Sequence, residues 1–144
     1  MIKKVDSDFN EETRVTYCYI TDEKGRLSIG SATCHEADID MMSWRTGEEI
    51  AFRRAKIQYL QTIRDADLKP ALAALKHLSG CMVHSTRFNP KSYENYMLQR
   101  QIRLLEFDLA TNKEMLAYER KNLKAYIDGK EKIYQRIRKA KSGQ

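Results

Sequence analysis

The sequence has few of the residues that interrupt regular structure. Two prolines and six glycines are spread over 144 residues, and these residue types most often end helices and strands. With 42% hydrophobic residues, the chain can bury one core, so we expect a single domain over residues 1–144. A folded, largely helical protein is expected in place of a disordered one.

Cysteines and long apolar runs are also scarce. Cys18, Cys34 and Cys81 are odd in number and follow no disulfide spacing, which favours free thiols in a reducing compartment. No apolar run approaches the roughly 18 residues of a membrane span, and the first residues lack the apolar stretch of a signal peptide. We therefore expect a cytoplasmic protein with no membrane partner.

The common catalytic and cofactor-binding motifs are absent. The sequence contains no glycine-rich phosphate loop, HExxH, CxxC or GxSxG, so we expect no enzymatic activity and no cofactor. The best metal candidate combines His77, Cys81 and His84, but zinc would need a fourth ligand from Cys34 or His35. A buried cysteine beside exposed histidines is the favoured interpretation, and no metal is expected.

Residues 13–34 favour a β-hairpin. The segment 13–20 (TRVTYCYI) is rich in β-branched and aromatic residues, and a turn-like segment at 22–25 separates it from 26–34 (RLSIGSATC). A lone hairpin is marginal in water and needs a cover. This short antiparallel unit is therefore expected to pack on helices, which makes the fold class α+β.

A bent helix is expected at about residues 47–79. Thr46 and Glu49 match a capping box, and Pro70 should bend the helix because it lacks a backbone N–H. Gly80 is expected to end it. The preceding loop carries carboxylates, which are favoured before a helix N-terminus. These carboxylates are Glu36, Asp38 and Asp40.

Asn89 and Pro90 indicate the start of a long helix, expected at about residues 90–140. Apolar residues recur every seven positions in the row Ile102, Leu109, Leu116 and Leu123. A second row, from Leu98 and Leu105, is interrupted by Asn112 and Glu119. Further apolar side chains widen the surface, namely Met97, Leu104, Phe107, Met115 and Tyr118. We therefore expect a coiled-coil-type helix that packs both on the first helix and on another subunit, in a homo-oligomer of two or more chains.

Cations and aromatic rings gather in residues 85–103, around the expected helix start. Backbone N–H groups and arginine bind phosphate, and an aromatic ring stacks on a base. The segment therefore predicts a site for a small phosphorylated nucleotide, with ligand-binding residues Arg87, Phe88, Asn89, Lys91, Tyr96, Arg100 and Arg103. The alternative is structural: Phe88 staples the helix start, Tyr96 packs and the arginines are solvated.

A short antiparallel β-unit, two C-terminal helices and a basic, aromatic, Asn-containing connection (RFNPKSYEN) occur in this order. This layout resembles the phage-encoded anti-Thoeris sponge proteins, which capture cyclic ADP-ribose isomers made by bacterial immune enzymes. The resemblance implies a non-enzymatic oligomer in the host-cell cytoplasm, with Phe88 and Asn89 near a ligand. It matches element order and no diagnostic motif, and the strongly basic tail departs from it.

Two other functions stay open at this point. Nine Lys and Arg against two acidic residues lie between residues 120 and 144, and such a tail can bind nucleic acid, although exposed helices are often Lys-rich for solubility. A hairpin followed by a helix with Arg53, Arg54 and Lys56 loosely resembles a double-stranded-RNA-binding module. A plain coiled-coil adaptor is the third possibility, and it predicts no small-ligand pocket.

Overall fold

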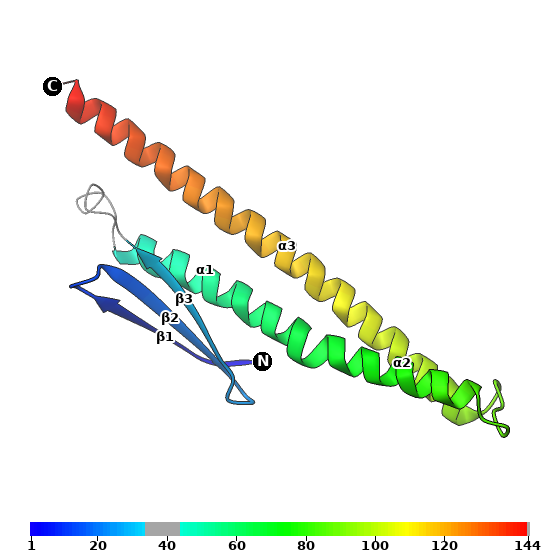
Figure 1. The fold of residues 1–144 in the computed structure, drawn as a ribbon. Helices are drawn as coiled ribbons and strands as arrows, with labels where there is room; N and C mark the ends of the chain where they lie inside the picture. The colour runs from blue at the N-terminus through cyan, green and yellow to red at the C-terminus, as the bar shows by residue number, and fades with distance from the viewer. Residues whose placement is uncertain (34–43, 144) are drawn as a thin grey trace. The chain divides into compact units, whose positions relative to one another are not determined.

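The computed structural model describes residues 1–33 and 44–143 (Figure 1). A three-stranded antiparallel sheet precedes the helices, as the α+β prediction requires. The strands are β1 (Ile2–Asn10), β2 (Val15–Asp22) and β3 (Leu27–Thr33). The helices are α1 (Trp44–Thr62), the π-helix η2 (Ile63–Leu68), α2 (Lys69–Val83) and α3 (Tyr93–Ser142). None of the helices in the described ranges is long and apolar enough to cross a membrane.

The chain divides into two compact units, which are described separately. Unit 1 comprises residues 1–59 and 117–144, and unit 2 comprises residues 60–116. The sheet and the first part of α1 belong to unit 1 with the C-terminal part of α3. Unit 2 contains η2, α2 and the N-terminal part of α3.

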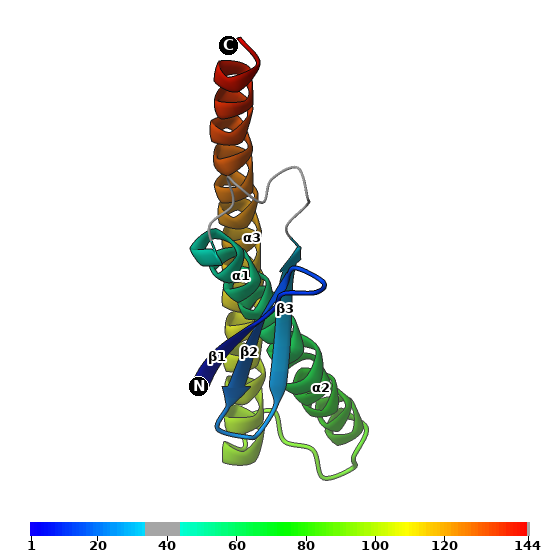
Figure 2. The same cartoon turned by 90° about the vertical axis from the view of Figure 1, so that its left-hand side faces the viewer.

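The sheet of unit 1 contains one strand more than the sequence indicated. β2 and β3 form the expected hairpin, and β1 pairs with β2 on the other side, giving the order β1-β2-β3 (Figure 2). Every residue of β1 is exposed. The sequence IKKVDSDFN of this edge strand therefore lacks the alternation of polar and apolar residues that marks a half-buried strand.

The sheet face that packs on α1 combines Ile20 with several small side chains. Cys18, Ile20 and Ala32 are buried there, and Gly30 is pressed against the helix. A Cβ atom on Gly30 would collide with the backbone of Ala51 and Ala55 in α1. Glycine at this position therefore lets the helix backbone approach the sheet closely.

The outer edge of β3 is covered by side chains from α1. Gln58 Oε1 accepts a hydrogen bond from the Ile29 N–H at 2.7 Å, and Arg54 donates to the Ser31 carbonyl at 2.7 Å. These contacts occupy backbone groups that would otherwise be open to pairing with another strand. Arg54 is thus part of the fold of unit 1.

Asp22 organises the turn between β2 and β3. Its Oδ1 accepts hydrogen bonds from the Lys24 and Arg26 N–H groups, at 3.0 and 2.9 Å. Arg26 Nε donates to Oδ2 at 2.7 Å, and Gly25 completes the turn with φ of 77°. Burial alone would raise the pKa of Asp22, but the hydrogen bonds and charge of Arg26 outweigh it and lower this pKa.

The helical run from α1 through η2 to α2 begins earlier and ends later than the bent helix expected at 47–79, at Trp44 and Val83. α1 starts at Trp44, so Thr46 is buried inside the first turn and does not cap the helix as the sequence suggested. A π-helical segment directly precedes α2, in which Pro70 is the second residue. Gly80 lies inside α2, which continues to Val83, so this glycine does not end the helix as expected.

The face of α3 that carries the two seven-residue rows, which we call the seam, packs within the chain. In unit 2, Leu98 and Ile102 form a core with Leu72 of α2, against which Leu105 and Leu109 pack. The polar residues of the second row belong to the same face. Asn112 is buried and its Nδ2 donates to the Leu60 carbonyl at 3.2 Å. In unit 1, Lys56 pairs with Glu119 at 2.9 Å.

Burial of Leu98 and Ile102 therefore needs no second subunit, because α2 of the same chain covers them. The expected oligomer stays a prediction, and an argument for it has to come from another face of α3.

Replacing Gly30 by alanine should destabilise unit 1 by about 2–4 kcal/mol or prevent folding, because the added methyl group meets helix backbone that has to move. Gly80→Ala is the matched control. Nothing lies within 4 Å of a Cβ at Gly80, so this helical substitution should stabilise by about 0.5–1 kcal/mol. Urea unfolding of both variants checks the signs, and equal effects would contradict the close approach of α1 and β3.

The lowered pKa of Asp22 predicts an acid-sensitive contribution to stability. A carboxylate with a folded-state pKa below its unfolded value, about 3.9, stabilises the fold at neutral pH and loses this effect as pH falls through the folded pKa. The difference in unfolding free energy between the wild type and Asp22→Asn should therefore shrink as pH is lowered below about 4. Asp8→Asn, at an exposed strand position, controls for the change in net charge. A difference that stays constant with pH would contradict the role of the Asp22 carboxylate.

Candidate functional site

The connection between α2 and α3 is a series of hydrogen-bonded turns in unit 2. The N–H groups of Ser85 and Phe88 donate to the Met82 and Ser85 carbonyls, at 3.0 and 3.1 Å. Asn89 Oδ1 accepts from the Lys91 N–H at 3.0 Å. The loop, residues 84–92, is therefore shaped by its own side chains and backbone.

The helix start differs from the sequence prediction by three residues. Asn89 and Pro90 were expected at the cap, but α3 begins at Tyr93. Ser92 caps it, since its Oγ accepts the Asn95 N–H at 3.2 Å. Asn89 instead uses its side chain in the turn before the helix. Local hydrogen bonding of this kind competes with helix capping for the same residue type.

A cavity of about 250 Å³ lies beside this loop. Three of the seven predicted ligand-binding residues line it, namely Arg87, Phe88 and Asn89. The sequence analysis did not assign the other lining residues, which are Met82, Ser85, Ser92 and Glu94. Ser92 lies three residues before Asn95, the spacing at which an N-cap serine accepts the backbone N–H of the third helical residue. Serine as a preferred N-cap residue could therefore have placed Ser92 at the site.

The remaining predicted residues do not line this cavity. Lys91 and Tyr96 are exposed, and Arg100 and Arg103 are exposed farther along α3. The structure therefore brings together one cation, one ring and one amide of the predicted set.

The lining groups differ in the chemistry they offer. Arg87 can donate several hydrogen bonds to an anion, and the half-buried Phe88 offers an aromatic face. Glu94 is an acceptor for hydroxyl or amine hydrogens and repels an adjacent phosphate. The cavity thus suits a ligand that has an anionic group on one side and a donor-bearing group on the other.

The metal candidate is incomplete in the part of the chain that the structure describes. His77 Nε2 lies 3.7 Å from Cys81 Sγ, and Cys81 is exposed, which corrects the expectation of a buried thiol. The described residues contain no cluster of three possible metal ligands. Cys34 and His35 lie outside the described residues, as do Glu36, Asp38 and Asp40.

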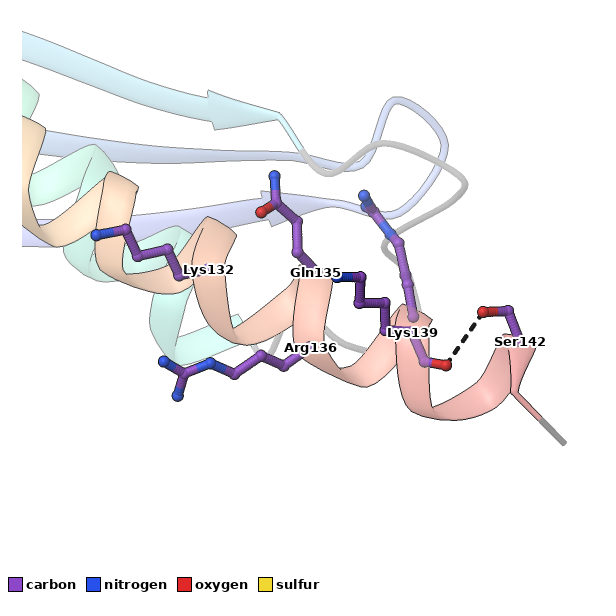
Figure 3. Close-up of a pocket in the computed structure, with 6 residues that line it drawn as sticks. Lys132, Gln135, Arg136, Lys139 and Ser142 are labelled. Atoms are coloured by element: carbon purple, nitrogen blue, oxygen red, sulfur yellow. Dashed lines mark hydrogen bonds between the residues drawn. The ribbon is translucent and has the colours of Figure 1, made fainter.

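The basic end of α3 carries a second cavity, of about 500 Å³, in unit 1 (Figure 3). Lys132, Arg136 and Lys139 follow one another at four and three residues, so they share a helix face. Gln135, Arg138 and Ser142 complete the lining. Figure 3 shows the labelled side chains of this lining along the last turns of the helix, namely Lys132, Gln135, Arg136, Lys139 and Ser142.

Arg53, Arg54 and Lys56, the cations that suggested an RNA-binding module, contact other residues of unit 1. Arg53 pairs with Glu49 at 2.8 Å and lies 5.2 Å from the Tyr126 ring centroid. Lys56 pairs with Glu119, and Arg54 donates to the β3 backbone. Binding RNA through these three residues would have to replace those contacts.

Comparisons with protein-family models, curated proteins and solved structures give no match, so the two cavities are interpreted from their own geometry.

Proposed function

We propose that this protein is a non-enzymatic binder that captures a small phosphorylated nucleotide at the loop between α2 and α3. The observation that carries the proposal is the cavity in which Arg87, Phe88 and Asn89 meet beside the start of α3. A guanidinium for phosphate, a ring for a base and an amide for base or sugar edges are the groups that nucleotide recognition uses.

The size of the cavity limits what it holds. Ligand pockets for whole small molecules measure about 300–1,000 Å³, whereas this cavity has about 250 Å³. It accommodates part of a nucleotide, such as one base with its sugar, and the rest of the ligand extends over the exposed loop surface.

Capture without turnover is part of the proposal, and the composition of the lining supports it. None of the lining residues is a histidine, cysteine or lysine, and the Oγ atoms of Ser85 and Ser92 accept hydrogen bonds from the Arg87 and Asn95 N–H groups. The lining therefore places no histidine or lysine beside a serine, which is a common way to activate a nucleophile.

The resemblance to anti-Thoeris proteins suggests a biological role for such capture. The ligand would be a nucleotide-derived immune messenger, either a cyclic ADP-ribose isomer or a cyclic oligonucleotide. A phage protein that sequesters it would inhibit bacterial anti-phage defence.

Arg87→Ala should weaken binding of cyclic ADP-ribose isomers or cyclic oligonucleotides by about 1.5–3 kcal/mol, the scale of a hydrogen bond to a charged group. Phe88→Ala should weaken it by about 1–3 kcal/mol if the ring stacks on a base. Arg120→Ala removes the same charge at an exposed position of α3 and should leave affinity unchanged. Calorimetry measures all three, and an absence of heat with every nucleotide would refute the proposal.

Binding of nucleic acid or another polyanion through the basic end of α3 is a second candidate function. The observation that favours it is the exposed face of Lys132, Arg136 and Lys139 around a hollow of about 500 Å³. Contacts from these residues would go to phosphates, which position a nucleic acid without reading its sequence.

Replacing Lys132, Arg136 and Lys139 together by alanine should weaken duplex binding and flatten its salt dependence. Each lost phosphate contact reduces the slope of log K against log salt by about 0.9. Changing Lys113, Lys121 and Lys124, also exposed on α3, to alanine removes the same charge as a control. Tight binding that does not change between low and high salt would contradict this candidate.

A further inference from the structure

α3 carries a second apolar stripe, which remains exposed to solvent in the described part of the chain. Leu104 is 47% exposed, Phe107 69%, Met115 44% and Tyr118 64%. Successive residues turn by about 100° around a helix, which places these four on one face, away from the buried Ile102 and the rest of the seam. We call them the outer stripe. Contiguous exposed apolar residues of this kind mark interaction sites more often than scattered ones do.

The outer stripe has the same spacing when it is followed from either end. Leu104 and Tyr118 both lie seven residues from Thr111, and Phe107 and Met115 both lie four residues from it. An isologous dimer requires this property, because residue i of one copy has to meet residue j of the other while j meets i. An antiparallel pair of α3 helices centred on Thr111 places Leu104 opposite Tyr118 and Phe107 opposite Met115.

The same register explains a glycine in the helix. Gly129 lies 18 residues after Thr111, and the exposed Tyr93 lies 18 residues before it. Nothing lies within 4 Å of a Cβ built on Gly129, although glycine inside a helix costs about 1 kcal/mol relative to alanine. In the antiparallel pair, the large ring of Tyr93 in one copy faces Gly129 of the other copy, which has no side chain.

The area available reaches the lower limit of a biological interface. A fully buried aromatic side chain hides about 150–250 Å², so covering the exposed two thirds of Phe107 and Tyr118 removes roughly 100–150 Å² each. With Leu104, Met115 and the flanking residues, two copies together bury on the order of 1,000 Å². That is the lower range of a biological interface.

We propose that a second copy of this chain covers the outer stripe, with the two α3 helices antiparallel and a twofold axis at Thr111. The seam packs within each chain, and the outer stripe joins the two chains. The interface is independent of the proposed nucleotide site, because neither Phe107 nor Met115 lines that cavity.

Sedimentation velocity should show a dimer for the wild type and at least a 100-fold weaker dimer for Phe107→Asp, because each interface would then bury two unpaired carboxylates. Ala117→Asp introduces the same group at an exposed position away from the outer stripe and should leave the dimer intact. Circular dichroism confirms that both variants fold. A monomeric wild type, or equal dimerisation of the two variants, would overturn the proposal.

Cysteine cross-linking tests the register directly. Helices 8–10 Å apart bring facing Cα atoms to roughly 5 Å, which suits a disulfide. In a Cys34→Ser, Cys81→Ser background, Thr111→Cys should form a covalent dimer under mild oxidation. Leu104→Cys alone should not, but a mixture of Leu104→Cys and Tyr118→Cys chains should.

Self-linking of Leu104→Cys would indicate parallel helices and contradict the twofold axis at Thr111. Failure of both the Thr111→Cys protein and the mixture to cross-link would also overturn the register. Neither experiment involves a nucleotide, so their failure is distinguishable from failure of the ligand proposal.

Discussion

The fold depends on the burial of one face of α3 against helices of the same chain. A helix of 50 residues gains most of its stability from tertiary packing of its apolar face. Leu72, Leu98 and Ile102 provide that packing in unit 2. The buried Asn112 adds a directional contact, because its amide reaches the Leu60 carbonyl close to the start of η2. A shift of the helix by one turn would remove this hydrogen bond.

The burial of the α3 seam within the chain determines which other surfaces of α3 can contact partners. Because the seam is filled from within, the exposed surfaces of α3 and its preceding loop include the cavity beside the loop, the outer stripe and the basic end. Each has a different chemistry: a small cavity with a cation and a ring, an apolar face, and a row of positive charges. The proposed capture of a nucleotide and the proposed dimer therefore use separate residues, the first in the loop before α3 and the second on the helix itself.

Patterns in the sequence predicted the parts of the fold where one residue type repeats regularly. The β-branched and aromatic residues of 13–20 with the turn-like segment 22–25, and the seven-residue rows of α3, both gave the correct element type. The β1 strand was missed because an exposed edge strand can be polar on both faces. The rows could not reveal their partner, since seven-residue periodicity is the same for packing within a chain and between chains.

The sequence predicted some of the residues that line the candidate site and missed others. Composition placed cations and rings near a helix start, and Arg87, Phe88 and Asn89 do lie at one cavity. The sequence could not show that Asn89 would form a turn and that Ser92 would cap the helix. The helix therefore begins at Tyr93, and Arg100 and Arg103 lie farther along it, outside the cavity lining.

Far-UV circular dichroism, recorded at protein concentrations above and below the point at which the proposed dimer dissociates, tests the central claim most directly. If the seam of α3 packs within each chain, the separated monomer keeps the helical content of the dimer and still unfolds cooperatively on heating. Loss of helix on dissociation would contradict the account, because it would show that the seam is buried by a second chain.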